Sequence, residues 1–177
     1  MKKHKILTIP NLLSLLRLFL IPLMMWLYLE KQEYVWTFVV LVLSGVSDTL
    51  DGIIARKYNM ISDFGKALDP IADKLTQVAM LHCLSTSFPE IRYLLALLVI
   101  KETISGVMSI ISIRKTGQVQ GAEWHGKVTT VLLYVLIADR MVPGLLSMVL
   151  MLLCVGMMLL SMFLYVQRHW RTIQQKR

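Results

Sequence analysis

Long apolar runs, each ended by a short polar segment, are the feature that most limits what this sequence can fold into. A helix needs about 20 mostly apolar residues to cross a bilayer. We expect six membrane-spanning helices, at 7–29, 34–55, 69–87, 91–113, 127–141 and 143–166. Only 17% of the 177 residues are charged, whereas a soluble domain has about a quarter. The sequence therefore predicts an all-α integral membrane bundle that forms a single domain over residues 1–177.

The basic residues predict how this bundle is oriented. If the N-terminus is cytoplasmic, 13 of the 19 lysines and arginines fall in cytoplasmic segments, 3 in outer segments and 3 inside the helices. This bias is the positive-inside pattern. We therefore expect both termini in the cytoplasm and a multi-pass location in the cell (inner) membrane. Because the basic residues punctuate apolar runs, the net charge of +8 indicates membrane anchoring, and nucleic acid is not an expected partner.

Four aspartates occupy positions where a membrane helix normally avoids charge. Asp48 and Asp51 lie near the inner end of the second expected helix, and Asp69 and Asp73 lie near the inner start of the third. Their spacings are three and four residues, so each pair shares one helix face. Ionised groups inside a membrane are costly and are functional candidates by default.

Carboxylates gathered this closely repel one another unless cations separate them. Mg²⁺ and Mn²⁺ prefer oxygen ligands, and two such ions are a known device in phosphoryl chemistry. Gly52 and Gly65 allow close approach to the backbone, and Arg56 can grip a phosphate with its planar fork. Two alternatives remain at this point: a surface charge network with neighbouring lysines and Arg56, and a small metal-ion transporter. A transporter should place its ligands near the bilayer midplane, whereas these lie toward one face.

The same segment resembles a known family signature. From Asp48 the sequence reads DTLDGIIARKYNMISDFGKALDPIAD, which fits D-x2-D-G-x2-A-R-x8-G-x3-D-x3-D at every fixed position. This pattern resembles that of the CDP-alcohol phosphotransferases (CDP-alcohol phosphatidyltransferases). The resemblance implies a membrane enzyme that moves a substituted phosphoryl group from a CDP-alcohol to an acceptor hydroxyl and releases CMP. It also allows a homodimer.

The resemblance further implies a role for each matched residue. Asp48, Asp51, Asp69 and Asp73 correspond to the ligands of two divalent cations, and Asp73 also to the base that takes the acceptor's proton. The implied wall of the CDP pocket consists of Gly52, Ala55, Arg56 and Gly65.

Three further stretches resemble the branch of this family that uses CDP-diacylglycerol and glycerol 3-phosphate. They are IPNLLSLLRLFLIP at the start, DFGKALDPIADK at the second acid pair, and Lys101-Glu102 followed by HGKVTT. That branch usually has arginine where this chain has Lys101. Other acceptors stay open: phosphatidylglycerol, which would give cardiolipin, serine, and inositol phosphate.

Basic residues outside the signature are candidates for binding the phosphate of an anionic acceptor. For Arg114 and Lys127 we favour this role slightly over membrane anchoring. For Lys101, acceptor binding and a structural pair with Glu102 are equally favoured. Arg17, together with Asn11, either reaches the headgroup cavity or extends to the membrane interface. His125 is expected to be a solvated loop histidine rather than an acceptor contact.

Overall fold

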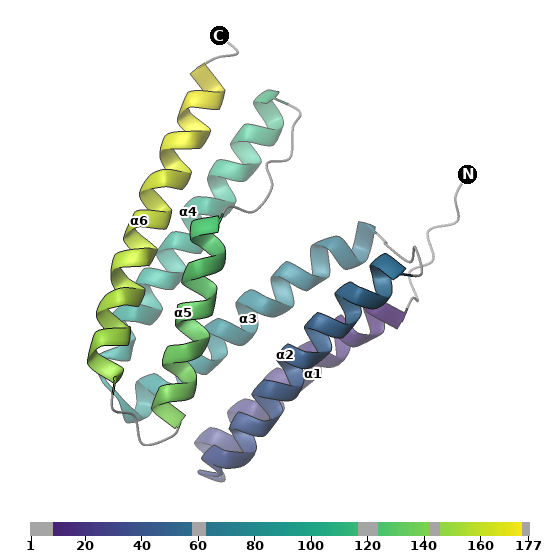
Figure 1. Cartoon of the computed structure of the whole chain (residues 1–177), viewed down its shortest axis with the longest axis vertical. Helices are drawn as coiled ribbons and strands as arrows, with labels where there is room; N and C mark the ends of the chain where they lie inside the picture. The colour runs from purple at the N-terminus through teal and green to yellow at the C-terminus, as the bar shows by residue number, and fades with distance from the viewer. Residues whose placement is uncertain (1–8, 58–62, 117–123, 142–145, 175–177) are drawn as a thin grey trace. The chain divides into compact units, whose positions relative to one another are not determined.

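The computed structural model describes residues 9–57, 63–116, 124–141 and 146–174, and every regular element within these ranges is a helix. The chain order is α1 (Ile9–Leu29), α2 (Tyr34–Lys57), α3 (Asp63–Ser87), α4 (Ile91–Thr116), α5 (Trp124–Met141) and α6 (Ser147–Gln174). Figure 1 shows these six helices. The predicted all-α class is confirmed.

Two helices extend beyond their expected membrane spans into polar sequence. The third helix begins at Asp63, six residues before the apolar run, and it continues through Pro70. The sixth helix extends beyond its apolar run to Gln174. The length of an apolar run shows how much of a helix suits lipid. A helix can extend beyond this run, because lysine, arginine and glutamine are good helix formers in water.

The chain divides into two compact units, residues 1–83 and 84–177. In the first unit, α1 and α2 form an antiparallel hairpin (Figure 1). The turn between them places Gln32 at a positive φ of 55°. Tyr28 and Tyr34 close the hairpin edge to face, with ring centroids 4.9 Å apart. The hairpin therefore fixes which residues of α1 lie beside the second half of α2.

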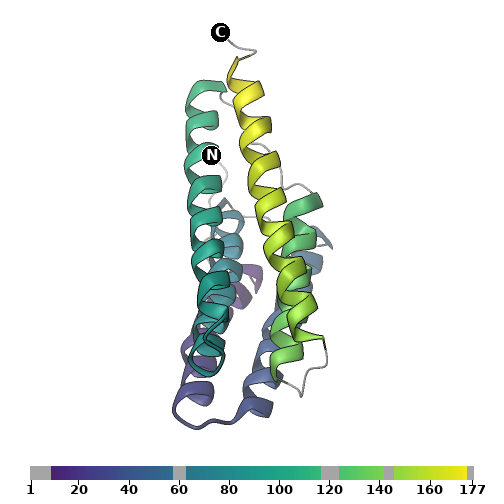
Figure 2. The ribbon, with the colours of Figure 1, turned by 90° about the vertical axis from the view of Figure 1, so that its left-hand side faces the viewer.

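In the second unit, α6 packs against both α4 and α5 (Figure 2). The buried side chains of this unit are mostly aliphatic and include Leu98 from α4, Leu133 and Ile137 from α5, and Met158 from α6. An ion pair between Glu90 and Arg140, 3.1 Å apart, joins the start of α4 to the end of α5. Arg140 also lies over the Phe88 ring, 4.5 Å from its centroid.

Within the described residues, three helices are long and apolar enough to cross a bilayer. Their apolar stretches are Asn11–Leu29, Ile91–Arg114 and Met148–Arg168. A shorter apolar stretch, Tyr34–Asp48, ends at the first aspartate of the signature. The first acid pair therefore begins where the apolar part of α2 ends.

Candidate active site

The signature occupies the end of α2 and the beginning of α3. Asp48 and Asp51 lie on α2, and Asp69 and Asp73 lie on α3, so both pairs have the helical spacing that the sequence predicted. For five predicted site residues the structure describes the helix and nothing more: Asp51, Gly52, Ala55, Arg56 and Gly65. Asp48, Asp69 and Asp73 are the signature aspartates whose side-chain contacts the structure describes.

Asp48 is bound by an arginine from the first helix. Nη1 of Arg17 lies 2.6 Å from Oδ1 of Asp48. The arginine side chain is 3% exposed, whereas the aspartate side chain is 53% exposed. The fork of Arg17 is thus enclosed by protein, and part of the carboxylate stays accessible. Of the two interpretations of Arg17, the structure supports the inward one.

Asp69 is bound by a second residue of the same helix. The Ser14 hydroxyl donates a hydrogen bond to Oδ1 of Asp69, and Ser14 is fully buried. Ser14 and Arg17 are three residues apart and share one face of α1. This face therefore contacts an aspartate of α2 and an aspartate of α3, and it brings the two acid pairs into one neighbourhood.

The polar face of α1 extends further toward the N-terminus. Asn11, three residues before Ser14, is also buried. Sequence reasoning proposed Asn11 and Arg17 as a pair but missed Ser14. The signal was present, because Asn11, Ser14 and Arg17 recur at every third position in the first half of an otherwise apolar helix.

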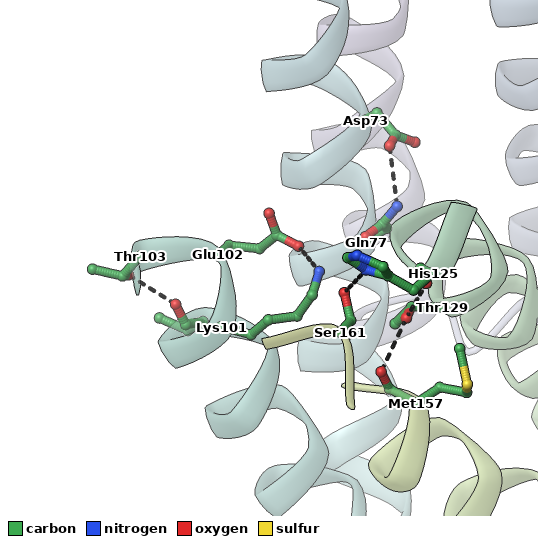
Figure 3. Close-up of polar contacts among 10 residues, drawn as sticks. Asp73, Gln77, Lys101, Glu102, Thr103, His125, Thr129, Met157 and Ser161 are labelled. Atoms are coloured by element: carbon green, nitrogen blue, oxygen red, sulfur yellow. Dashed lines mark hydrogen bonds and ion pairs between the residues drawn. The ribbon is translucent and has the colours of Figure 1, made fainter. Parts of the chain in front are cut away.

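Asp73 has a partner one turn along its own helix. Nε2 of the buried Gln77 donates to Oδ2 of Asp73 at 3.1 Å (Figure 3). Asp73 itself is half-buried. The amide fixes one carboxylate oxygen, and a carboxylate has about four acceptor positions in all.

The chemistry of the signature residues suits a hard divalent cation, because every candidate ligand is a carboxylate oxygen. Among the described side chains, which do not include Asp51, no three acidic, histidine or cysteine groups lie close enough to hold one ion.

The predicted acceptor residues lie in the second unit. Arg114 near the end of α4 and Lys127 in the first turn of α5 are both exposed. Lys101 is buried on α4, and its Nζ donates to Oε1 of Glu102 at 2.6 Å (Figure 3). The Lys101–Glu102 pair that the sequence suggested is thus present.

His125 differs from the sequence-based expectation. We expected a solvated loop histidine, but α5 begins at Trp124 and His125 is 2% exposed. Its Nδ1 is 2.9 Å from the Ser161 hydroxyl of α6 (Figure 3). The Thr129 hydroxyl, one turn later, donates to the His125 carbonyl at 2.8 Å. The expectation was wrong because the segment before Lys127 is polar in composition yet helical.

Comparison with known proteins identifies the family. Residues 7–167 match the CDP-alcohol phosphatidyltransferase family, and the chain belongs to it. The resemblance seen in the signature is therefore confirmed. Together with the three long apolar helices, this membership makes the chain a multi-pass membrane protein of a phosphatidyltransferase enzyme family.

Individual relatives have two different names. A CDP-diacylglycerol–glycerol-3-phosphate 3-phosphatidyltransferase of Aquifex aeolicus is 35% identical over 123 residues, which is 69% of this chain and 68% of that protein. One of the same name from Rickettsia typhi is 41% identical over 38% of this chain and 39% of its own length. A cardiolipin synthase (CMP-forming) of Streptomyces coelicolor is 51% identical over 76 residues, 40% of this chain. The match spans only about a third of that synthase, 35% of its length.

Proposed function

We propose that this protein transfers the phosphatidyl group of CDP-diacylglycerol to the hydroxyl of glycerol 3-phosphate and releases CMP, a step of phospholipid biosynthesis. The observation that supports this most is the Aquifex aeolicus relative named for this reaction, which matches over two thirds of both chains. The three stretches that resemble the glycerol-3-phosphate branch agree with it.

The signature residues would bind the reacting groups. Asp48, Asp51, Asp69 and Asp73 would hold two divalent cations, Mg²⁺ or Mn²⁺, through oxygen ligands. Bound there, the cations would neutralise the pyrophosphate and stabilise CMP as it leaves. Arg56 would grip a phosphate of the CDP group, and Gly52, Ala55 and Gly65 would form the wall beside it.

In this proposal the acceptor attacks directly and no covalent enzyme intermediate forms. Asp73 takes the proton from the acceptor hydroxyl. The acceptor oxygen then bonds to the phosphorus that bears diacylglycerol, and the bond from this phosphorus to the CMP oxygen breaks. Gln77 supports this role, because its amide donates to Oδ2 of Asp73 and so restricts the orientation of the carboxylate.

The orientation follows from where the basic residues lie. We propose six spanning helices, both termini in the cytoplasm, and an active site at the cytoplasmic face of the cell (inner) membrane. The distribution of lysine and arginine supports this. It also suits the substrates, because glycerol 3-phosphate is a soluble anion that enters from water, whereas CDP-diacylglycerol enters from lipid.

A second acceptor has its own support. The segment shared with the Streptomyces coelicolor cardiolipin synthase is 51% identical, a higher identity than that of the Aquifex aeolicus match, though it is shorter. The alternative reaction uses phosphatidylglycerol as acceptor and gives cardiolipin by the same chemistry.

The acceptor assay tests the function directly. Purified protein in detergent, given CDP-diacylglycerol and Mg²⁺ or Mn²⁺, should release CMP when glycerol 3-phosphate is added and should form phosphatidylglycerophosphate. Parallel reactions should contain phosphatidylglycerol, serine or inositol phosphate. Cardiolipin formation with no product from glycerol 3-phosphate would establish the second candidate, and no CMP release with any acceptor would contradict both.

Removal of metal should stop the reaction. Carboxylates on adjoining helices repel one another without cations, and the pyrophosphate of the donor then lacks its counter-charge. We expect excess chelator to abolish CMP release and added Mg²⁺ or Mn²⁺ to restore it. Full activity in excess chelator would show that the two-metal proposal is wrong.

Replacing Asp73 should separate chemistry from binding. Asp73→Asn keeps the size of the side chain but removes the base, and general-base catalysis typically contributes about 10²–10⁴-fold. We expect turnover to fall by that order while CDP-diacylglycerol still binds measurably. Asp139→Asn, which neutralises a half-buried aspartate of α5, is the matched control and should leave turnover near normal. Near-normal turnover of Asp73→Asn would mean that the base lies elsewhere.

Basic residues near the end of α4 and the start of α5 should set acceptor affinity. A hydrogen bond from a charged donor contributes about 1.5–3 kcal/mol, so its loss weakens binding about ten- to a hundredfold. Arg114→Ala and Lys127→Ala should raise the KM for glycerol 3-phosphate and leave the KM for CDP-diacylglycerol nearly unchanged. Arg92→Ala, at the start of α4, is the control. If neither KM for glycerol 3-phosphate moves, Lys101 and Arg17 become the candidates for the phosphate site.

A further inference from the structure

We propose that Ser14 and Arg17 of α1 are positioning residues that orient Asp69 and Asp48 for cation binding. Both residues lie outside the Asp48–Asp73 signature. The inference rests on the proposed function, because it assumes that these aspartates hold divalent cations. The first helix would then supply the side chains that hold the metal-binding aspartates in place.

Arg17 is a buried cation paired with an accessible carboxylate. Burying a guanidinium carries a large desolvation free energy unless an opposite charge pairs with it. Removing one partner of a buried pair is strongly destabilising, because the other charge is then left uncompensated. Arg17 is 3% exposed and meets Asp48 at 2.6 Å. This pairing restricts the orientation of the carboxylate. Because Asp48 remains 53% exposed, the contact does not cover the whole carboxylate, and its remaining acceptor positions can bind a cation.

Ser14 makes a neutral contact with the other aspartate. Its hydroxyl is fully buried and donates to Oδ1 of Asp69, so one lone pair of that oxygen is occupied. A single hydrogen bond of this kind leaves the other acceptor positions of the carboxylate available. Carboxylates that ligate metals are commonly held by such outer hydrogen bonds.

The two contacts link three helices. Asp48 and Asp69 belong to different helices, and Ser14 and Arg17 are one turn apart on a third. Rotating or shifting α1 would therefore displace both aspartates together. The Arg17–Asp48 pair is not the only contact between α1 and α2, because the two helices also pack together and are closed by Tyr28 and Tyr34.

The serine gives the cleaner test, because its replacement changes no charge. In detergent-purified protein, Mn²⁺ affinity can be measured by the paramagnetic resonance signal of the free ion. Losing an outer partner of a metal ligand typically costs about 10–100-fold in affinity. We expect Ser14→Ala to weaken Mn²⁺ binding by that order, and Ser14→Thr, which keeps a hydroxyl, to restore most of it. Ser47→Ala is the matched control, since the Ser47 hydroxyl donates to the Leu43 carbonyl of its own helix at 2.8 Å.

The arginine is tested with its charge retained. Arg17→Lys keeps the cation but loses the planar fork. We expect the Mg²⁺ concentration for half-maximal CMP release to rise, with the rate at saturating Mg²⁺ close to wild type. Arg140→Lys alters the comparable pair with Glu90 and should leave the metal dependence unchanged. Thermal unfolding of each variant checks that the protein is folded.

The outcomes separate the two proposals. If the wild-type protein binds Mn²⁺ and both Ser14→Ala and Arg17→Lys bind it as tightly, the positioning role is overturned while the proposed function stands. A purely structural role is indicated, and the inference overturned, if the variants lose stability and maximal rate without any shift in metal dependence. If the wild-type protein binds no divalent cation and needs none, the metal proposal itself fails.

Discussion

Charge placed in or beside hydrocarbon must be compensated locally, and this constraint governs the first unit. A carboxylate or guanidinium at the centre of a bilayer costs about 2.5–3.5 kcal/mol on insertion scales. Asp48 lies where the apolar stretch of α2 ends, and Arg17 lies within the apolar stretch of α1. Their ion pair offsets part of the cost for both helices. On the same helix face, the Ser14 hydroxyl donates to Asp69. Although α1 is mostly apolar, it therefore makes polar contacts with two aspartates of the signature.

Polar contacts have a corresponding role in the second unit. Lipid is as apolar as leucine, so association of membrane helices depends on packing and on hydrogen bonds between helices. His125 of α5 bonds to Ser161 of α6, and Ser109 of α4 bonds to Tyr165 of α6. Each such bond contributes only about 0.6 kcal/mol on average in membranes. Together they select one rotation of α6 against its two neighbours, which apolar packing alone specifies weakly.

Sequence patterns predicted those features that follow from local spacing. The aspartate pairs needed only the helical repeat, and the all-α class needed only the length of the apolar runs. The residue type of Ser14 did not indicate its role, because a serine in a membrane helix usually bonds to its own backbone, as Ser47 does. Only its three-residue spacing from Asn11 and Arg17 indicated it. The expectation for His125 was wrong for another reason. Hydropathy indicates which residues suit lipid and not which are helical, so the polar residues before Lys127 gave no sign that the helix begins at Trp124. Both errors concern contacts between segments distant in sequence, Ser14 with Asp69 and His125 with Ser161.

Choice of acceptor must depend on residues beyond those that perform the common chemistry. Relatives with two different names both match this chain, so the reaction they share cannot by itself select the acceptor. Glycerol 3-phosphate is a soluble dianion that loses much of its hydration on binding, and charge-assisted hydrogen bonds from fixed cationic side chains replace this hydration most strongly. A lipid acceptor arrives within the bilayer with its tails already solvated, and it gains less from such charges. Arg114 and Lys127 are exposed at the chain-adjacent ends of α4 and α5, whereas Lys101 is already paired with Glu102. The exposed pair is therefore better suited than Lys101 to distinguish a water-soluble phosphate from a lipid headgroup.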